Sequence, residues 1–318
     1  MKVSDYIVDF LQKKGIDTAF IVSGGAAAHL LNSLRESKIN YICNAHEQAC
    51  AMAAEGYARV ANKPALVMVT NGPGSSNTIT GILGAYQDSI PMFVVSGQVP
   101  NSQSMTSLYG IANVRQIGVQ ECDIIKIVSS ITKYSIKVTD HLKIREILEE
   151  AYYCCMSGRK GPVWIDVPID IQNKQINPDE LSPYIPPATL NKEYSFDNII
   201  DIIKTSKKPL IVTGNGIHLS QTEEKFYTLL KILNIPAICS WTSKDLYNSN
   251  DKNYVGTYGV FGERAGNFAV QSADLLIILG SRLSIPNTGY QTNLFSPNSK
   301  KIMVDIDINE LNKPSLKI

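Results

Sequence analysis

The residues of this sequence best placed for chemistry follow short apolar runs, where strand-like segments change to helical ones. Glu47 is the first of them, because it lies between an apolar run that ends near Asn44 and an alanine-rich helical pattern over 47–61. A carboxyl at such a junction can exchange a proton with a bound ligand. Its simplest structural role is to offset the positive end of the helix dipole. Taken alone, the position of Glu47 at the start of a helical pattern favours that structural role.

The glycine-rich turn 70–77, Thr-Asn-Gly-Pro-Gly-Ser-Ser-Asn, is the second candidate. Its glycines let the backbone approach a ligand, and the helix that follows offers unpaired N–H donors. No Gly-Lys-Ser/Thr follows, so the turn is not a P-loop, and it also lacks the G-x-G-x-x-G pattern of dinucleotide-binding turns. By itself, a tight turn capped by Ser75 or Ser76 is an equally good interpretation.

A third turn, over 21–27, contains Gly24 and Gly25 and again joins a strand-like run to a helical one. Three such turns fall within the first eighty residues. In a parallel sheet the carboxyl ends of the strands share one edge, and ligands bind in the crevice there. The three turns together therefore predict one binding site more strongly than any of them does alone.

The elements that would hold these turns form two blocks of short apolar runs with helical patterns between them. This alternation predicts an α/β fold with two doubly wound parallel-sheet domains. The runs predicted as buried strands are 19–23, 41–44, 65–70, 92–96 and 163–167 in the first block, and 209–213, 235–239, 274–279 and 301–305 in the second.

Composition limits the function classes. The chain has 318 residues and a formal net charge of +1, which removes the simplest argument for nucleic acid or an anionic membrane as partner. No apolar run approaches the roughly 20 residues of a membrane span, and residues 1–15 form an amphipathic helical pattern rather than a signal sequence. The six cysteines show no CxxC spacing, which favours buried free thiols. A cytoplasmic protein is expected.

Residues 2–170 resemble the N-terminal part of thiamine-diphosphate-dependent enzymes of the acetolactate synthase and pyruvate oxidase group. The resemblance implies a pyrimidine-binding domain over 1–172. It is carried, in order, by His46–Arg59, Thr70–Asn77, Asp88–Pro91, Gly97–Pro100, Gln120–Asp123 and Gly161–Pro168.

The resemblance also implies a role for each site residue. Glu47 would be the catalytic glutamate that hydrogen-bonds the pyrimidine N1′ and exchanges a proton there, which burial between apolar walls would favour. The cofactor would then act as the electron sink when a 2-keto acid loses CO₂. Thr70, Gly74 and Asn77 would line the pyrimidine pocket. The backbone at Gly24 and Gly25 would face the reacting carbonyl, and Gln120 would lie close to the reaction intermediate.

After a proline-rich linker over 173–195, residues 196–318 resemble the Rossmann-like middle domain of the same group, which implies a six-stranded parallel sheet. True acetolactate synthases hold FAD there through a Gly-Ser or Gly-Ala followed by Arg-Phe-Asp-Asp-Arg. Here that stretch is Gly280–Asn287, and the family's Gly-Met-His-Gly becomes Gly256-Thr-Tyr-Gly259. These departures argue against FAD.

The family's third domain holds the diphosphate and Mg²⁺ through a Gly-Asp-Gly motif, and no Asp-Gly pair occurs in this sequence. We therefore expect the Mg²⁺ ligands to lie outside this chain and the C-terminal diphosphate-binding domain to be absent from it. A truncated chain that is inactive alone is the leading interpretation, ahead of a natural split subunit. The resemblance implies a homodimer or homotetramer, because the two halves of the cofactor site come from different subunits.

The function expected is that of an acetolactate-synthase-like carboligase acting on a 2-keto acid. A 2-keto acid decarboxylase or a carboligase of sugar biosynthesis is the alternative within enzymes, and a non-catalytic binding or assembly module is the alternative outside them. Before Gln120 the synthases usually carry Ala-Phe, whereas this chain has Gly118-Val119. Loss of the aromatic ring implies a second-substrate pocket of different volume.

Overall fold

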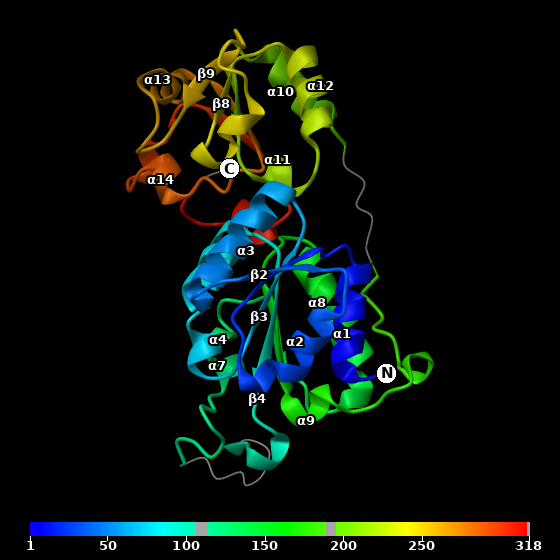
Figure 1. Ribbon diagram of the computed structural model, residues 1–318. Coiled ribbons are helices and arrows are strands. Elements are labelled where there is room, and N and C mark those ends of the chain that lie inside the picture. The colour runs from blue at the N-terminus through cyan, green and yellow to red at the C-terminus, as the bar shows by residue number, and fades with distance from the viewer. Residues whose placement is uncertain (106–113, 189–194, 317–318) are drawn as a thin grey trace. The chain divides into compact units, whose positions relative to one another are not determined.

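The computed structural model describes residues 1–105, 114–188 and 195–316. It divides into two units, Met1–Ala188 and Thr189–Ile318, each built on one parallel sheet with helices on its faces (Figure 1). The first sheet has six strands in the order β2-β1-β3-β4-β6-β5, and the second has five in the order β11-β10-β7-β8-β9. The predicted fold class of two doubly wound α/β domains is confirmed.

The first sheet is most buried at its centre. There β3, β4 and β6 are buried at every position, because helices cover both faces of a parallel sheet. Its strands are β1 (Thr18–Ile21), β2 (Asn40–Cys43), β3 (Ala65–Val69), β4 (Met92–Gln98), β5 (Tyr134–Lys137) and β6 (Val163–Pro168).

Helices on the first sheet fall into two groups, one on each face (Figure 1). One group is α1 (Val3–Lys13), α2 (Ala28–Arg35), α8 (Ile144–Met156) and α9 (Ile169–Gln172). The other contains α3 (Glu47–Ala61), α4 (Pro73–Ser76), α5 (Ile79–Asp88) and α7 (Ile124–Val128). The N-terminal helix forms as its pattern predicts, with Val3, Ile7 and Leu11 fully buried on one stripe.

Both edge strands of the first sheet differ from the prediction. The run 41–44 is predicted as a buried strand, but β2 is exposed along its length, and Tyr41 and Ile42 are each 47% exposed. The prediction was wrong because β2 has a strand neighbour on one side only. Strand β5 was missed, since its sequence Tyr-Ser-Ile-Lys contains no continuous apolar run.

Among the described residues of the second unit the sheet has five strands, one fewer than the six that the resemblance implies. The sequence itself showed four strand-like runs. The strand that no apolar run predicted is β9, because its four residues, Tyr-Val-Gly-Thr, include a glycine and form no continuous apolar run. The strands are β7 (Pro209–Thr213), β8 (Ala237–Cys239), β9 (Tyr254–Thr257), β10 (Leu275–Leu279) and β11 (Lys300–Val304). The helices are α10 (Asp197–Thr205), α11 (Gly216–Leu219), α12 (Glu223–Leu233), α13 (Arg264–Ser272), α14 (Ile285–Thr288) and α15 (Ile308–Leu311).

Part of the segment predicted as a linker packs on the first unit. The amino group of Met1 donates a hydrogen bond to the Ile176 carbonyl at 3.0 Å, and Lys2 pairs with Gln175 in an antiparallel bridge. Leu181 is 4% exposed and belongs to the first core. The first compact unit, Met1–Ala188, thus includes the part of the predicted linker up to that residue. Residues 189–194 of the predicted linker lie outside the described part of the chain.

The six cysteines are all free thiols, but they are not all buried as predicted. Cys50, Cys155 and Cys239 are buried, whereas Cys43 is exposed and Cys122 and Cys154 are partly exposed. Cys43 is exposed because it ends the edge strand β2. Over residues 1–105, 114–188 and 195–316, no helix combines the length and the apolar character that a membrane crossing requires.

Candidate functional site

The three turns predicted to share a site follow three adjacent strands. Strands β2, β1 and β3 are neighbours and run parallel, so their carboxyl ends lie at one edge of the first sheet. The segment that contains Gly24 follows β1, the segment that leads into Glu47 follows β2, and the glycine-rich turn follows β3. The sheet therefore brings the three turns to one edge, where parallel sheets bind ligands.

Glu47 is the first residue of α3, and its side chain is partly buried. His46 caps this helix, because its backbone is extended and its Nδ1 accepts a hydrogen bond from the Gln48 N–H at 3.1 Å. The Glu47 Oε2 atom accepts a hydrogen bond from the Asn77 Nδ2 at 2.9 Å. Within this chain Glu47 is thus partly rather than fully buried, and its hydrogen-bond partner Asn77 is exposed.

Two glycines make close contact between the turns possible. A Cβ atom on Gly24 would overlap the Cβ of Thr70, so only glycine lets the first turn lie against the third. A Cβ on Gly74 would lie 2.6 Å from the Thr70 Cγ2 and 3.4 Å from the Glu47 Oε1. Gly25 differs, because a Cβ there would meet nothing within 4 Å. Gly24, Thr70, Gly74, Glu47 and Asn77 therefore form one continuous group, and Gly25 lies beside it on the open side.

Gln120 joins this edge through its backbone. Its φ of +57° lies in the left-handed region, and its carbonyl packs so closely on Gly72 that a Cβ there would overlap it. The Asn71 Nδ2 donates a hydrogen bond to the Val119 carbonyl at 2.8 Å. The structure thus places the Gln120 segment directly on the glycine-rich turn.

A buried polar network beneath the same edge was not predicted from the sequence. Asp166 on β6 is 1% exposed and accepts hydrogen bonds from the Ser96 Oγ at 2.6 Å and the Gln98 Nε2 at 2.9 Å, both on β4. The Trp164 Nε1 donates to the same Ser96 Oγ at 2.8 Å. The signal was a carboxylate within the otherwise apolar run 163–167.

Burial raises the pKa of Asp166 to about 7, and the hydrogen bonds from Ser96 and Gln98 offset only part of that effect. The Gln98 Nε2 donates a second hydrogen bond, to the Cys122 carbonyl at 3.1 Å. The network therefore extends from the sheet to the segment that carries Gln120.

Glu121 is a second buried carboxylate beside Gln120, and it too was not predicted. It is 9% exposed and accepts three backbone N–H groups, from Met105 at 2.7 Å, Ile117 at 3.2 Å and Gly118 at 3.1 Å. Burial raises the pKa of Glu121, but the hydrogen bonds from these N–H groups outweigh it and hold the pKa below the ordinary value for glutamate. Glu121 is therefore ionised at neutral pH.

The donors and acceptors at the edge suit an aminopyrimidine better than a metal. Glu47, Asn77 and the Thr70 hydroxyl offer both hydrogen-bond donors and acceptors, and the two close-packed glycines keep the backbone accessible beside them. Among the residues that the structure describes, no group of three or more His, Cys, Asp or Glu side chains could hold a metal ion. The residues present thus fit a planar heteroaromatic ring that hydrogen-bonds along its edge.

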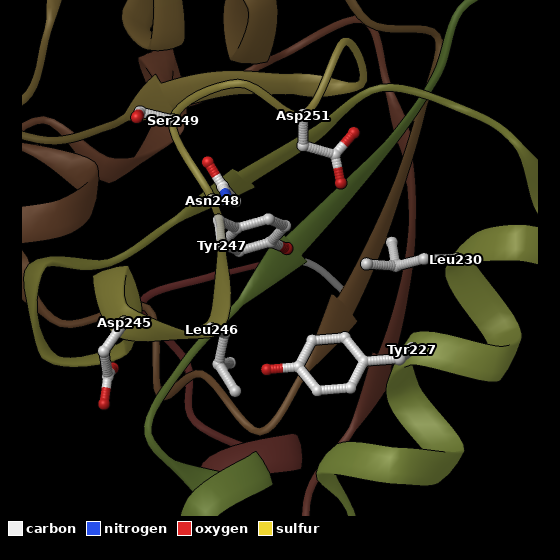
Figure 2. A pocket seen from close by; sticks show the side chains of 8 residues that line it. All are labelled: Tyr227, Leu230, Asp245, Leu246, Tyr247, Asn248, Ser249 and Asp251. Atoms are coloured by element: carbon white, nitrogen blue, oxygen red, sulfur yellow. The ribbon is translucent and has the colours of Figure 1, made fainter.

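Two hollows lie away from the predicted residues. One, of about 600 Å³, lies in the second unit, where Tyr227 and Leu230 project from α12 toward the segment 245–251 (Figure 2). The other, of about 410 Å³, lies in the first unit and is lined by His29, Ile169, Asp170, Asn173 and Lys174. None of the predicted site residues lines either hollow.

Comparison with known proteins covers both units. A family described as "Thiamine pyrophosphate enzyme, N-terminal TPP binding domain" matches residues 1–127, and one described as "Thiamine pyrophosphate enzyme, central domain" matches residues 196–317. Thiamine pyrophosphate is the same compound as thiamine diphosphate.

Curated relatives match along nearly the whole chain. The chain is 33% identical to acetolactate synthase 2, chloroplastic, of Nicotiana tabacum, over 98% of this chain and 46% of that protein. It is 32% identical to the acetolactate synthase isozyme 2 large subunit of Escherichia coli K12, over 98% and 55% respectively. A probable acetolactate synthase large subunit of Methanococcus aeolicus is also 32% identical, over 98% and 52%. The chain thus spans about half the length of these relatives, and it belongs to the thiamine pyrophosphate enzymes, with the N-terminal and central domains of that family.

Proposed function

We propose that the protein is an acetolactate-synthase-like carboligase acting on a 2-keto acid, and that its first unit binds the aminopyrimidine half of thiamine diphosphate. The observation that carries this proposal is the contact of Glu47 with Asn77 and with the glycine-rich turn at the carboxyl edge of the first sheet. The match to acetolactate synthases over 98% of the chain supports it.

Each residue at the edge has a distinct task in this proposal. Thr70, Gly74 and Asn77 line one side of the pyrimidine ring, and the backbone at Gly24 and Gly25 faces the reacting carbonyl. Asn77 donates its hydrogen bond to the Oε2 of Glu47, which keeps that oxygen as an acceptor. The proton that Glu47 exchanges with the pyrimidine therefore resides on Oε1. When bound, thiamine diphosphate supplies the electron sink for decarboxylation of the 2-keto acid.

Gln120 is the residue proposed to meet the substrate. Val119, which precedes it, is 77% exposed, and neither Val119 nor Gly118 carries a large side chain beside the site. We expect the second-substrate pocket to be wider than one that holds a phenylalanine at this position. The diphosphate and Mg²⁺ would be held by groups other than the described residues, in an assembly of at least two subunits in the cytoplasm.

We also propose that the second unit holds no FAD, because Gly280–Asn287 and Gly256–Gly259 depart from the stretches that the resemblance implies for flavin binding. The turn at Gly214 and Gly216 packs directly on Gly280, where a Cβ on Gly216 would lie 2.6 Å from the Gly280 Cα. Tyr258 is 4% exposed and lies in the core of this unit, with its hydroxyl 3.2 Å from the Ser281 Oγ. The Gly214 and Gly280 turns meet because β7 and β10 are neighbouring strands, and Tyr258 of the Gly256–Gly259 stretch is buried in the core.

Replacement of Glu47 by Gln tests the proposal in the natural full-length protein. Glu47→Gln keeps an acceptor for Asn77 but cannot exchange a proton, so we expect turnover of a 2-keto acid such as pyruvate to fall by about 100-fold or more. The measurement is consumption of the keto acid with added thiamine diphosphate and Mg²⁺. Glu36→Gln is the matched control, because Glu36 pairs with Arg35 on the exposed surface of the first unit. An unchanged rate in Glu47→Gln would falsify the assignment of Glu47.

A further inference from the structure

We propose that Asn71 and Glu121 are positioning residues that hold the Gln120 turn, residues 119–122, on the glycine-rich turn and thereby set where Gln120 meets the substrate. This inference rests on the proposed function, since it concerns the same site. Neither residue needs to touch the substrate, because each acts through the backbone on either side of Gln120.

Asn71 anchors the start of the turn. Its side chain is 4% exposed, and its Nδ2 donates to the Val119 carbonyl at 2.8 Å. Its Oδ1 accepts a hydrogen bond from the Thr70 Oγ1 at 3.3 Å. One buried amide therefore connects a residue of the proposed pyrimidine pocket to the residue directly before Gln120.

Glu121 anchors the other side of Gln120. Its Oε1 accepts the Met105 N–H, and its Oε2 accepts the N–H groups of Ile117 and Gly118. Three hydrogen bonds to one carboxylate fix both the side chain and the backbone that precedes Val119. Hydrogen bonds to a charged acceptor are stronger than neutral ones, so this contact is well suited to holding a turn in one conformation.

The backbone of Gln120 explains why such anchors are needed. A glutamine at φ +57° occupies a region that non-glycine residues adopt infrequently, and surrounding contacts must maintain it. The Gln98 Nε2, which also binds Asp166, supplies a third contact through the Cys122 carbonyl at 3.1 Å. The contacts thus reach both sides of Gln120, from the glycine-rich turn and from the sheet.

Hydrogen exchange tests the anchors without any cofactor. Asn71→Asp removes the side-chain donor to the Val119 carbonyl. Glu121→Gln replaces one of the two carboxylate oxygens, both of which accept backbone N–H groups, by an NH₂ group that cannot accept. We expect amide exchange in segment 117–122 to rise by about tenfold or more in each variant, while exchange in the strands β3 and β4 stays unchanged. Glu36→Gln, on the exposed end of α2, is the matched control. Unchanged exchange in 117–122 would overturn the proposal.

Kinetics in the natural full-length protein test the positioning role. In Asn71→Asp and in Glu121→Gln we expect kcat/KM for the 2-keto acid to fall by about 10- to 100-fold. A displacement of about 1 Å at a substrate contact can cost that much. The Kd of thiamine diphosphate should stay within about threefold, and Glu121→Asp, which keeps both acceptor oxygens, should recover part of the loss. If kcat/KM is unchanged, or falls only in step with cofactor binding, the positioning role is refuted. If the unmodified protein turns over no 2-keto acid, the proposed function fails, and the exchange data alone decide whether the anchors exist.

Discussion

At the scale of single residues, the candidate site depends on which positions lack a side chain. Gly24 and Gly25 are adjacent and both follow β1, yet a Cβ would overlap Thr70 at the first and meet nothing within 4 Å at the second. The two positions therefore allow a matched comparison. It separates a steric requirement from the general effect of replacing glycine by alanine.

We expect Gly24→Ala to destabilise the first unit by about 1–3 kcal/mol, because Thr70 or the turn itself must shift to admit the methyl group. Gly25→Ala should change stability by less than about 1 kcal/mol, since the methyl group enters open space. The measurement is urea unfolding followed by the fluorescence of the buried Trp164, in a Trp241→Phe background. Equal effects at the two positions would show that Gly24 does not contact Thr70 as closely as the structure has it.

At the scale of elements, β4 and β6 are joined by side chains as well as by the strand ladder. Asp166 on β6 binds Ser96 and Gln98 on β4, and the Trp164 indole shares Ser96. Asp166, Ser96 and Gln98 lie in the carboxyl half of the two strands, and Gln98 also contacts the Gln120 turn. A buried carboxyl in this place makes the stability of the first unit depend on pH.

The sign of this dependence follows from the raised pKa of Asp166. Its folded-state pKa of about 7 lies above the ordinary 3.8, so between these values the folded protein keeps a proton that the unfolded chain loses. The stability contribution is complete below about 3.8 and is lost as pH rises through about 7.

Relative to Asp166→Asn, we therefore expect wild-type stability to decline by up to about 1.4 kcal/mol per pH unit across this range. Asparagine can donate to Ser96 and accept from Gln98, so the variant should fold. Urea unfolding at several pH values measures the difference in free energy of unfolding. A difference that does not vary with pH would contradict the assigned protonation of Asp166.

At the scale of the whole molecule, the chain combines two parallel-sheet units with separate cores. The first core gathers apolar side chains from α1, α2, α8 and the strands of the first sheet. The second unit has clusters on both faces of its own sheet. Polar residues proposed to bind the cofactor lie in the first unit, and we expect the second unit to hold no FAD.

The cofactor content of the natural full-length protein tests this division. We expect the purified protein to be colourless and to release no flavin on heating, because Gly280–Asn287 and Gly256–Gly259 depart from the stretches that the resemblance implies for flavin binding. Absorbance near 450 nm and fluorescence of the heated supernatant measure flavin. A yellow protein that releases about one flavin per chain would refute the expected absence of FAD.

Much of this protein could be predicted from local patterns in its sequence. Apolar runs that alternate with helical patterns predicted two parallel-sheet domains, and glycines after strands predicted that Gly24, Glu47 and the glycine-rich turn would meet at one edge. Such patterns are local consequences of strand and helix periodicity, so they can be read without a structure. They failed where an edge strand has no apolar run, as in β5, or is exposed, as in β2.

Only the tertiary structure decided which side chains meet. Asn77 binds Glu47, which lies thirty residues earlier in the chain, and Asn71 binds the backbone of Val119. Asp166 on β6 binds Gln98 on the neighbouring strand β4. These contacts depend on strand order, register and the path of the connecting segments, which no local pattern specifies. Sequence alone therefore determined the fold class and the edge that carries the candidate site. The packed structure determined that Gln120 is held there by buried polar side chains, because satisfying those groups requires partners distant in the chain.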